Sequence, residues 1–346
     1  MNFELPGPRW DELPRMRRLL LGSAALCCLA GSRDARVTRH VRPGGADATV
    51  DPWPGRAAIP SPSPGGAPCR WVNVTYPGVR EFRQCVRPAG AGDLISDVVA
   101  RDGRWRECDA LVPLWRETAD EPAGLFVDVG ANIGACALPL LRLGARTLAF
   151  EPLRVNLAYL TRSALANGPM RWFLSLYAVA LGSAAGEVDV FSQRSNRGNS
   201  VVGRAFDRGD ARTRPAFDAY RARVATLDDV LWPAGAPPPP PIRLMKVDVQ
   251  GFEPRVFDGA ARLLAAGLVR VVKFELAPDY LAAVNGGDAA AGPRMLAALE
   301  ARGFVLESAE SGCARSRAAK AVVCDREVVA RLNRTRARRS NPGRPS

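Results

Sequence analysis

The feature that most constrains the fold is a short apolar segment that ends in an acidic residue and opens into a glycine-containing turn. Residues 125–129 (LFVDV) carry Asp128, and residues 130–134 (GANIG) form the turn. An apolar stretch follows at 135–143, and a second apolar run, TLAF, ends in Glu151. This order predicts strand, turn, helix and strand, a βαβ unit that binds ligands at the carboxyl ends of its parallel strands.

The same residues predict a nucleoside cofactor site. Glycine lets the backbone approach a ligand closely, and a carboxylate after the second strand accepts hydrogen bonds from ribose hydroxyls. The dinucleotide pattern G-x-G-x-x-G is absent, and the turn holds no basic residue. A cofactor without phosphates, S-adenosylmethionine, fits this turn; an ordinary βαβ turn is the alternative. The predicted cofactor-binding residues are Asp128, Gly130, Asn132, Gly134, Glu151 and Pro152.

Further motifs downstream resemble a known family. The chain reads TLDD at 226–229, KVDVQGFE at 246–253, GA at 259–260 and FE at 274–275. With the two motifs above, this order resembles the FkbM-type S-adenosylmethionine-dependent methyltransferases. The Asn196–Ser200 segment also looks like the glycine-serine loop of that family. The resemblance covers roughly residues 120–310, the length of a single domain.

The expected fold class is α/β. Strands alternate with helices, which predicts a mostly parallel sheet with helices on both faces. The resemblance implies the class I methyltransferase (Rossmann-like) seven-stranded sheet, whose last strand is antiparallel. Region 184–241 breaks the alternation, with a hairpin at 187–191 and the 196–200 loop, and is expected to cover the active site. Strands are expected near 125–129, 147–151, 176–181, 243–249, 270–276, 303–307 and 321–324, and helices at 133–143, 153–166, 253–265 and 293–302.

Three carboxylates are the candidate catalytic residues, Asp248, Glu253 and Glu275. Methyl transfer from a sulfonium is an in-line displacement, so the enzyme mainly aligns donor and acceptor. Asp248 ends the strand next to the cofactor strand and is the expected base or acceptor-orienting group. Glu253 begins a helix, where capping is its alternative role, and Glu275 ends the next strand. The trio could instead bind Mg²⁺ or Ca²⁺, but no metal is predicted. Gln250 stands where many family members have glutamate.

Composition excludes several other classes of protein. The net charge of +13 comes from 45 arginines and three lysines, scattered except in the tail 331–339. Because nucleic-acid binding wants clustered charge with stacking aromatics, no nucleic-acid partner is expected. The one histidine, His40, lies in a Pro/Gly-rich stretch. Ser-His-Asp, Cys-His and His-rich zinc sites are therefore excluded from the folded domain.

The amino-terminal part has the layout of a targeting segment. Basic residues at 15–18 precede a twelve-residue apolar run at 19–30, which predicts a signal peptide or short signal anchor over 1–31. A Pro/Gly-rich linker (32–68), an extension packing on the core (69–119), the methyltransferase domain (120–325) and a basic disordered tail (326–346) would follow. A membrane tether through residues 19–30 is the alternative to cleavage.

Cysteine usage favours the secretory pathway lumen or secretion over an organellar or cytoplasmic location. Cys69 and Cys85 bracket a segment that a disulfide could staple, and Cys313 and Cys324 flank an expected terminal strand pair. Cys136 is expected to be a buried small hydrophobe. Six free thiols in a cytosolic enzyme are the alternative. Two glycosylation sequons, at Asn73 and Asn333, are compatible with a lumenal location.

The predicted function is O-methylation of a hydroxyl on a glycan or small metabolite, with S-adenosylmethionine as the donor. The acceptor is implied by the family resemblance alone. N-methylation and a non-catalytic lumenal protein that retains the fold are the alternatives. A dinucleotide-dependent oxidoreductase is opposed by the missing third glycine.

Overall fold

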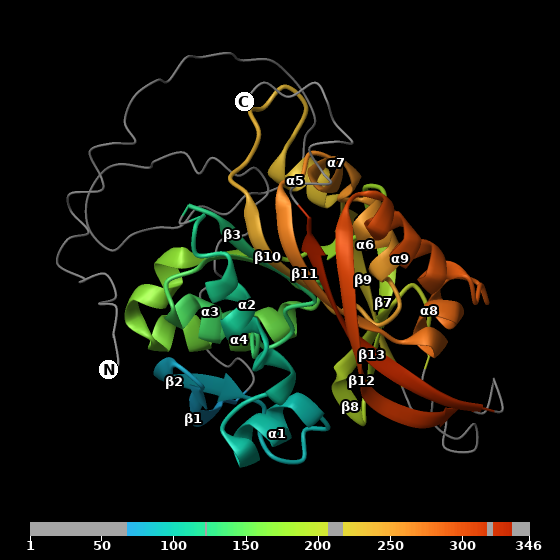
Figure 1. Ribbon diagram of the computed structural model, residues 1–346. Helices are drawn as coiled ribbons and strands as arrows, with labels where there is room; N and C mark the ends of the chain where they lie inside the picture. Colours follow the sequence, from blue (N-terminus) through green and yellow to red (C-terminus); the bar gives the residue numbers. More distant parts are fainter. Residues whose placement is uncertain (1–67, 122, 207–216, 317–320, 334–346) are drawn as a thin grey trace. The chain divides into compact units, whose positions relative to one another are not determined.

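The computed structural model describes residues 68–121, 123–206, 217–316 and 321–333 (Figure 1). The predicted leader 1–31, the linker up to residue 67 and the tail after 333 lie outside the described residues. A seven-stranded sheet has the strand order β12-β13-β11-β10-β3-β4-β5. Its strands are β3 (Leu125–Val129), β4 (Arg146–Phe150), β5 (Leu174–Tyr177), β10 (Ile242–Val247), β11 (Val269–Leu276), β12 (Phe304–Ser316) and β13 (Ala321–Leu332).

The sheet confirms the expected fold class. The five strands from β5 to β11 are parallel, whereas β13 is antiparallel to both of its neighbours. Among the described residues β13 is also the last strand in sequence order, and it is antiparallel, as expected for the class I methyltransferase fold. The parallel strands β3, β10 and β11 lie side by side at the centre, so their carboxyl ends meet at one edge (Figure 1).

Helices pack on both faces of this sheet. The described helices are α1 (Leu94–Asp102), α2 (Leu111–Glu117), α3 (Ala137–Arg142), α4 (Arg154–Ala166), α5 (Leu227–Leu231), α6 (Glu253–Asp258), α7 (Ala261–Ala265), α8 (Pro278–Val284) and α9 (Ala291–Ala301). Of these, α1 lies against β1, β2 and β8 and not on this sheet. The helix expected over 253–265 is two helices, separated at Gly259 and Ala260. A Cβ at Gly259 would overlap the carbonyl oxygen of Gly182, so this position brings two backbones together. Within the described ranges, no helix is long and apolar enough to cross a membrane.

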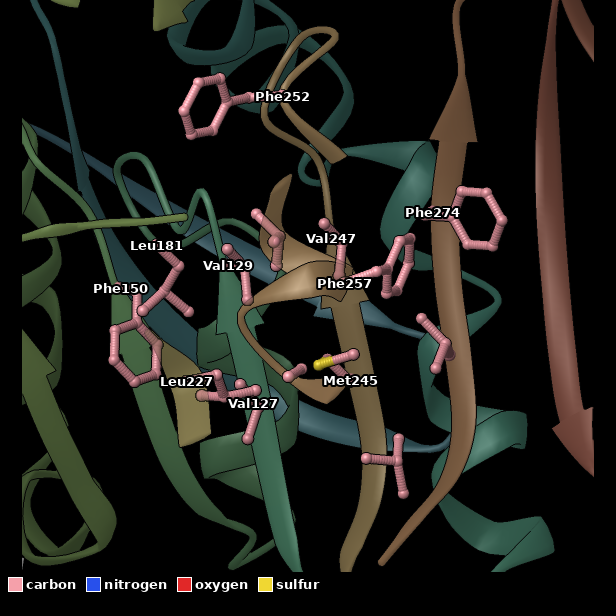
Figure 2. Packing of buried hydrophobic residues seen from close by; sticks show 14 of the residues in the cluster. Val127, Val129, Phe150, Leu181, Leu227, Met245, Val247, Phe252, Phe257 and Phe274 are labelled. Carbon is pink, nitrogen blue, oxygen red and sulfur yellow. The ribbon is translucent and has the colours of Figure 1, made fainter. Parts of the chain in front are cut away.

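The two faces carry separate apolar clusters because strand side chains alternate between them. Val127 and Val129 of β3 belong to the cluster that includes α6 to α9, whereas Phe126 belongs to the cluster that includes α2 to α4. Figure 2 shows part of the first cluster, to which Met245 and Phe274 of the neighbouring strands contribute. The same alternation places Asp128 and Lys246 on the face of the second cluster.

β13 is longer than the sequence predicted. It runs to Leu332, so the expected boundary between domain and tail at 325 falls inside a strand. The disordered tail predicted from residue 326 is therefore wrong for 326–332. Val328 and Ala330 are buried at alternate positions, and this period-two apolar pattern outweighs the arginines between and beyond them. In the backbone register of this hairpin, Cys313 lies directly opposite Cys324.

Region 184–241 is more regular than expected. A four-stranded sheet has the order β6-β9-β7-β8, with β6 (Ala180–Leu181), β7 (Gly186–Gln193), β8 (Asn196–Val202) and β9 (Phe217–Ala225). The predicted hairpin at 187–191 lies within β7, which pairs with β8 and β9. The segment predicted as a loop at Asn196–Ser200 is the first part of β8. This segment is a strand because it pairs with β7. Its short polar sequence gives no sign of that pairing.

The N-terminal extension is built from a β-hairpin, α1, a 3-10 turn and α2. The hairpin strands are β1 (Arg70–Tyr76) and β2 (Val79–Val86), and the 3-10 turn is η3 (Arg106–Cys108). Tyr76 donates its hydroxyl hydrogen to the Ala135 carbonyl oxygen at 3.1 Å. This bond joins the extension to the segment that follows the predicted cofactor turn.

Two disulfides reinforce the extension. Cys69 pairs with Cys85, a pairing that the sequence left open as possible. Cys136 is buried, as predicted, but it forms a disulfide with Cys108, which the sequence did not predict. Four of the six cysteines after the apolar run are therefore not free thiols. Sequence spacing cannot reveal the second pair because connectivity depends on the fold. This disulfide ties η3 directly to the start of α3.

Removal of the Cys108–Cys136 disulfide should lower stability substantially. Replacing both residues by serine is expected to lower the free energy of unfolding by about 3 kcal/mol, because the bridge restricts the unfolded chain across a long loop. Urea denaturation of the wild-type protein and the double variant measures the difference. An unchanged unfolding midpoint, with the bridge verified by mass spectrometry in the wild type, would contradict this account.

Candidate functional site

A cavity lies at the carboxyl ends of β3, β4 and β10. Five segments contribute to its wall: the turn after β3, the end of β4, the end of β10, β8 and the N-terminal extension. Their lining residues include Gly130, Asn132, Glu151, Pro152, Lys246, Asp248, Gln250, Gly198, Ser200, Ile95 and Trp105. The structure therefore brings four of the predicted cofactor residues and one predicted catalytic residue together. Asp128, Gly134, Glu253 and Glu275 do not line this cavity.

The turn after β3 has a backbone that only particular residues adopt. Gly130 has φ of 78° and Asn132 has φ of 48°; asparagine is one of the few side chains found in this left-handed region. A Cβ at Gly130 would overlap the Asp248 carbonyl oxygen, and one at Gly134 would overlap the Leu160 side chain. Gly130 therefore lets β3 and the end of β10 approach closely, while Gly134 lets the turn pack on α4.

Glu151 fastens this turn to the end of β4. One carboxylate oxygen accepts a hydrogen bond from the Asn132 backbone N–H at 2.9 Å. The other accepts from the Leu153 N–H at 2.9 Å and from the Asn156 side-chain amide at 3.2 Å. A carboxylate has about four acceptor positions, so one remains for a ligand hydroxyl. Burial raises the pKa of Glu151.

Lys246 is the central charge of the site, and the sequence analysis missed its role. Its ammonium group lies 3.1 Å from the Asp248 carboxylate and 3.6 Å from the Asp128 carboxylate. It also donates to the Gly130 carbonyl oxygen at 3.0 Å. Burial opposes the charged form, but the two carboxylates raise the pKa of Lys246 above its ordinary value. The Lys246 ammonium group thus contacts both carboxylates and the turn after β3.

The strand register explains why Lys246 and Asp128 meet. Lys246 of β10 is directly opposite Asp128 of β3, and both point to the same face. Asp128 is fully buried, and among the described residues neither of its carboxylate oxygens has a hydrogen-bond partner. Asp128 therefore lies behind Lys246, and a direct contact with the cofactor stays a prediction. The available signal was a lysine, one of three in the chain, in a mostly apolar strand whose other charged residue is Arg243.

Asp248 stands on the cavity wall, and Gln250 connects it to Glu275. The Gln250 amide donates to Asp248 at 2.9 Å and to Glu275 at 3.3 Å. Burial disfavours ionisation of Asp248, but the Lys246 ammonium and the Gln250 amide hold its pKa below the ordinary value. Burial and the nearby Asp248 charge raise the pKa of Glu275 to about 8. Asp248 is therefore the ionised carboxylate of this pair.

Glu253 occupies a structural position. Its carboxylate accepts a hydrogen bond from the Val249 N–H at 3.0 Å and braces the turn between β10 and α6. The side chain is buried and lies off the cavity wall. Glu253 is the first residue of α6, but this bond is to the turn before the helix, so both the capping alternative and a catalytic role stay untested.

Glu253 should make stability depend on pH. Burial raises the pKa of Glu253 from 4.5 to about 7. The Glu253 carboxyl group therefore binds its proton more tightly in the folded protein than in the unfolded chain. Stability linked to Glu253 is present at low pH and is lost as pH rises through 7. Glu253→Gln is therefore expected to be more stable than wild type at pH 8, by an amount of the order of 3 kcal/mol. Denaturation at pH 5 and pH 8 measures this; an equal difference at both would contradict it.

Two side chains on the cavity wall come from the N-terminal extension. Ile95 lies in α1, and Trp105 precedes η3. The Trp105 indole N–H donates to the Glu107 carboxylate at 3.0 Å, and the Trp105 backbone N–H donates to the Tyr76 hydroxyl at 3.1 Å. No motif marks these residues, because they lie before the region of family resemblance.

The region expected to cover the site contributes β8. The Asn132 side-chain amide donates to the Gly198 carbonyl oxygen at 3.2 Å, and Ser200 also lines the cavity. β8 is itself joined to the extension, because the Arg197 N–H donates to the Gly92 carbonyl oxygen at 2.6 Å. Within the described part of the chain, no group of three or more His, Cys, Asp or Glu side chains is placed to hold a metal ion.

Comparison with known proteins decides the family. The FkbM methyltransferase domain matches residues 128–306, more than half of the 346-residue chain. The chain belongs to the FkbM methyltransferase family. The match supports a methyltransferase that depends on S-adenosylmethionine. No curated protein sequence matches the chain significantly.

Solved structures similar to this family member include three methyltransferases. One is an FkbM methyltransferase from Methylobacillus flagellatus, 15% identical, with a TM-score of 0.34 over 59% of this chain and 43% of that one. Another is an S-adenosylmethionine-dependent methyltransferase from Agrobacterium tumefaciens, 10% identical, TM-score 0.40, over 78% and 72%. The third is a magnesium protoporphyrin IX methyltransferase from Synechocystis with bound S-adenosylhomocysteine, 13% identical, TM-score 0.36, over 71% and 90%. The chain thus spans less than half of the Methylobacillus protein.

Proposed function

We propose that this FkbM family member methylates a hydroxyl group of a glycan or small metabolite, with S-adenosylmethionine as the methyl donor. The observation that carries the proposal is that one cavity is lined both by four of the predicted cofactor residues and by an ion pair. The turn at Gly130 and Asn132, with Glu151, forms one wall, and the Lys246–Asp248 ion pair forms another. The first set suits a nucleoside, and the second suits an acceptor that must lose a proton.

The residues present fit S-adenosylmethionine better than a dinucleotide. Glu151 keeps one acceptor position for a ribose hydroxyl, and the turn at Gly130 brings backbone groups to the cavity. Lys246 is the one cationic side chain on the described cavity wall, and two carboxylates with a carbonyl oxygen already surround its ammonium group. A pyrophosphate would therefore meet carboxylates without a free positive charge.

Asp248 is the proposed proton acceptor for the acceptor hydroxyl. When bound, the cofactor supplies an electrophilic methyl group on a sulfonium. Asp248 accepts a hydrogen bond from the acceptor hydroxyl, orients its oxygen and takes its proton. Lys246 keeps Asp248 ionised, and Gln250 fixes the direction of its carboxylate. Trp105 and Ile95 close the acceptor side of the cavity and exclude water.

The proposed place of action is the lumen of the secretory pathway. The protein is then either secreted after cleavage of the signal peptide or tethered to the membrane through residues 19–30. Two disulfides support this proposal, since disulfides persist in oxidising compartments and are rare in the cytosol. Protease protection of the full-length chain in intact microsomes tests it. Digestion of the whole chain without detergent would contradict a lumenal location.

An acceptor screen tests the proposed reaction. Disulfide-intact protein is incubated with methyl-labelled S-adenosylmethionine and glycans, small hydroxyl metabolites, amines and peptides. We expect label in a methyl ether on a hydroxyl oxygen, identified by mass spectrometry and NMR. Label on nitrogen would overturn the O-methyl assignment. Binding of S-adenosylmethionine without transfer to any acceptor class would favour a non-catalytic protein.

A further inference from the structure

The exposed face of β1 carries an aromatic residue, an asparagine and a threonine in one line. Trp71, Asn73 and Thr75 are all exposed, whereas Val74 and Tyr76 of the same strand are buried. This alternation follows from the strand period of two, which sets side chains at positions i, i+2 and i+4 on one face. Asn73, Val74 and Thr75 also form the first glycosylation sequon.

We propose that Asn73 carries an N-linked oligosaccharide whose first sugar packs against Trp71. The proposal rests on the lumenal location proposed above and not on the reaction at the cavity. The Asn73 amide nitrogen forms a bond to C1 of the first sugar of a lipid-linked oligosaccharide diphosphate. The C1–O bond breaks, the lipid diphosphate leaves with the electron pair, and the amide proton passes to the lumenal transferase. The strand then presents the new sugar between Trp71 and Thr75.

Trp71 offers an exposed aromatic surface next to Asn73 against which a sugar can pack. The residue is 40% exposed, a high value for a large aromatic side chain. The Arg83 guanidinium lies over its ring, 4.9 Å from the centroid, and Arg83 is directly opposite Asn73 in the hairpin register. The C–H face of a sugar linked two residues away would remove exposed indole surface from water, which is favourable.

The hairpin holds this face in place. The Cys69–Cys85 disulfide closes its open end, and the Thr75 backbone N–H donates to the Gly103 carbonyl oxygen at 3.1 Å. The buried side of β1 contributes Val74 and Tyr76 to the core of the extension. A glycan on Asn73 would therefore extend away from the core and would not disturb the packing beneath it.

Expression in a eukaryotic secretory system tests whether Asn73 is modified. The full chain is produced with its own amino terminus and, in parallel, with an established cleavable signal placed before Ser32. Peptide mapping after endoglycosidase treatment should show that Asn73 is modified in both forms of the protein. The mass shift of the Asn73 peptide should be absent from the Asn73→Gln and Thr75→Ala variants. An unmodified Asn73 in protein secreted behind the replacement signal would overturn the site. Modification only behind that signal would support the site and overturn the lumenal location.

A thermal-unfolding cycle tests the packing against Trp71. Glycosylated protein is expected to unfold about 2 °C above the Asn73→Gln variant, and this gain should vanish in a Trp71→Ala background. The matched control is Trp172→Ala, because Trp172 is also exposed, at 49%, but lies in another segment. The control should keep the full gain. An equal rise in unfolding temperature on glycosylation, with and without Trp71, would overturn the proposed packing of the sugar on Trp71.

Discussion

Lys246→Met is expected to lower the free energy of unfolding at pH 7 by about 3–5 kcal/mol. The reason is the charge that would be left behind. Asp128 is fully buried, and Lys246 lies opposite it in the strand register with its ammonium group 3.6 Å from the carboxylate. Without the ammonium group, Asp128 must either remain charged in an apolar core or bind a proton. Urea denaturation of the variant and the wild type measures the loss.

A second substitution separates the charge from the side-chain volume. Lys246→Met combined with Asp128→Asn should recover most of the lost stability, because the fully buried carboxylate is then removed. Asp248 also loses its cation, but its side chain is 31% exposed and keeps contact with solvent. Burial already raises the pKa of Asp128, and removal of Lys246 should raise it further. The stability deficit of the single variant should thus shrink as pH falls and Asp128 is protonated. A double variant as unstable as the single one, at all pH values, would show that the ion pair is not the cause.

Asp248→Asn is expected to lower kcat by a factor of about 10²–10⁴, the usual contribution of a positioned proton acceptor. Asparagine preserves the shape of the side chain and keeps one of its two acceptor oxygens, which face the Gln250 amide and the Lys246 ammonium group. It cannot take a proton from the acceptor hydroxyl. Affinity for S-adenosylmethionine should be unchanged, because Gly130, Asn132 and Glu151 remain. Steady-state kinetics with the acceptor found in the screen, together with calorimetry, separates the two effects.

Glu275→Gln is the matched control for Asp248. Both carboxylates accept from the same Gln250 amide, but Glu275 lies off the cavity wall and its pKa of about 8 keeps it largely protonated at neutral pH. Its substitution should therefore cost much less activity. Because the pKa of Asp248 is lowered, the rate should be constant around neutral pH and should fall only in acid. Full activity of Asp248→Asn would rule out its proposed role.

The sheet could be predicted from the sequence because its central strands are short apolar runs with acidic or glycine-rich ends. β3 and its turn, the end of β4 and the β10 motif all carry signals within a few residues. The length of β13 could not be predicted, since arginines hide its alternating apolar positions. The cysteine pair Cys108–Cys136 was also out of reach, because it joins residues that only the folded extension brings together.

The candidate site was predictable where one segment contains the signal. Gly130, Asn132, Glu151 and Asp248 follow from local motifs, and the structure places them on one cavity. Lys246 needed the register between two strands that are distant in sequence. Trp105 and Ile95 needed the packing of the extension on the domain, which no periodicity reports. Glu253 shares a motif with Asp248, but it lies in α6 and off the cavity wall. Glu275 comes from a separate motif at the end of β11 and also lies off the cavity wall.

The most direct test of the account is calorimetric binding to disulfide-intact protein. S-adenosylmethionine and S-adenosylhomocysteine are titrated into the wild type and Glu151→Ala, with NAD as the control ligand. We expect one molecule of either cofactor form to bind per chain, no binding of NAD, and at least about tenfold weaker binding to the variant, equivalent to about 1.4 kcal/mol. A folded wild-type protein that binds neither cofactor form, or that binds NAD, would contradict the assignment of this site.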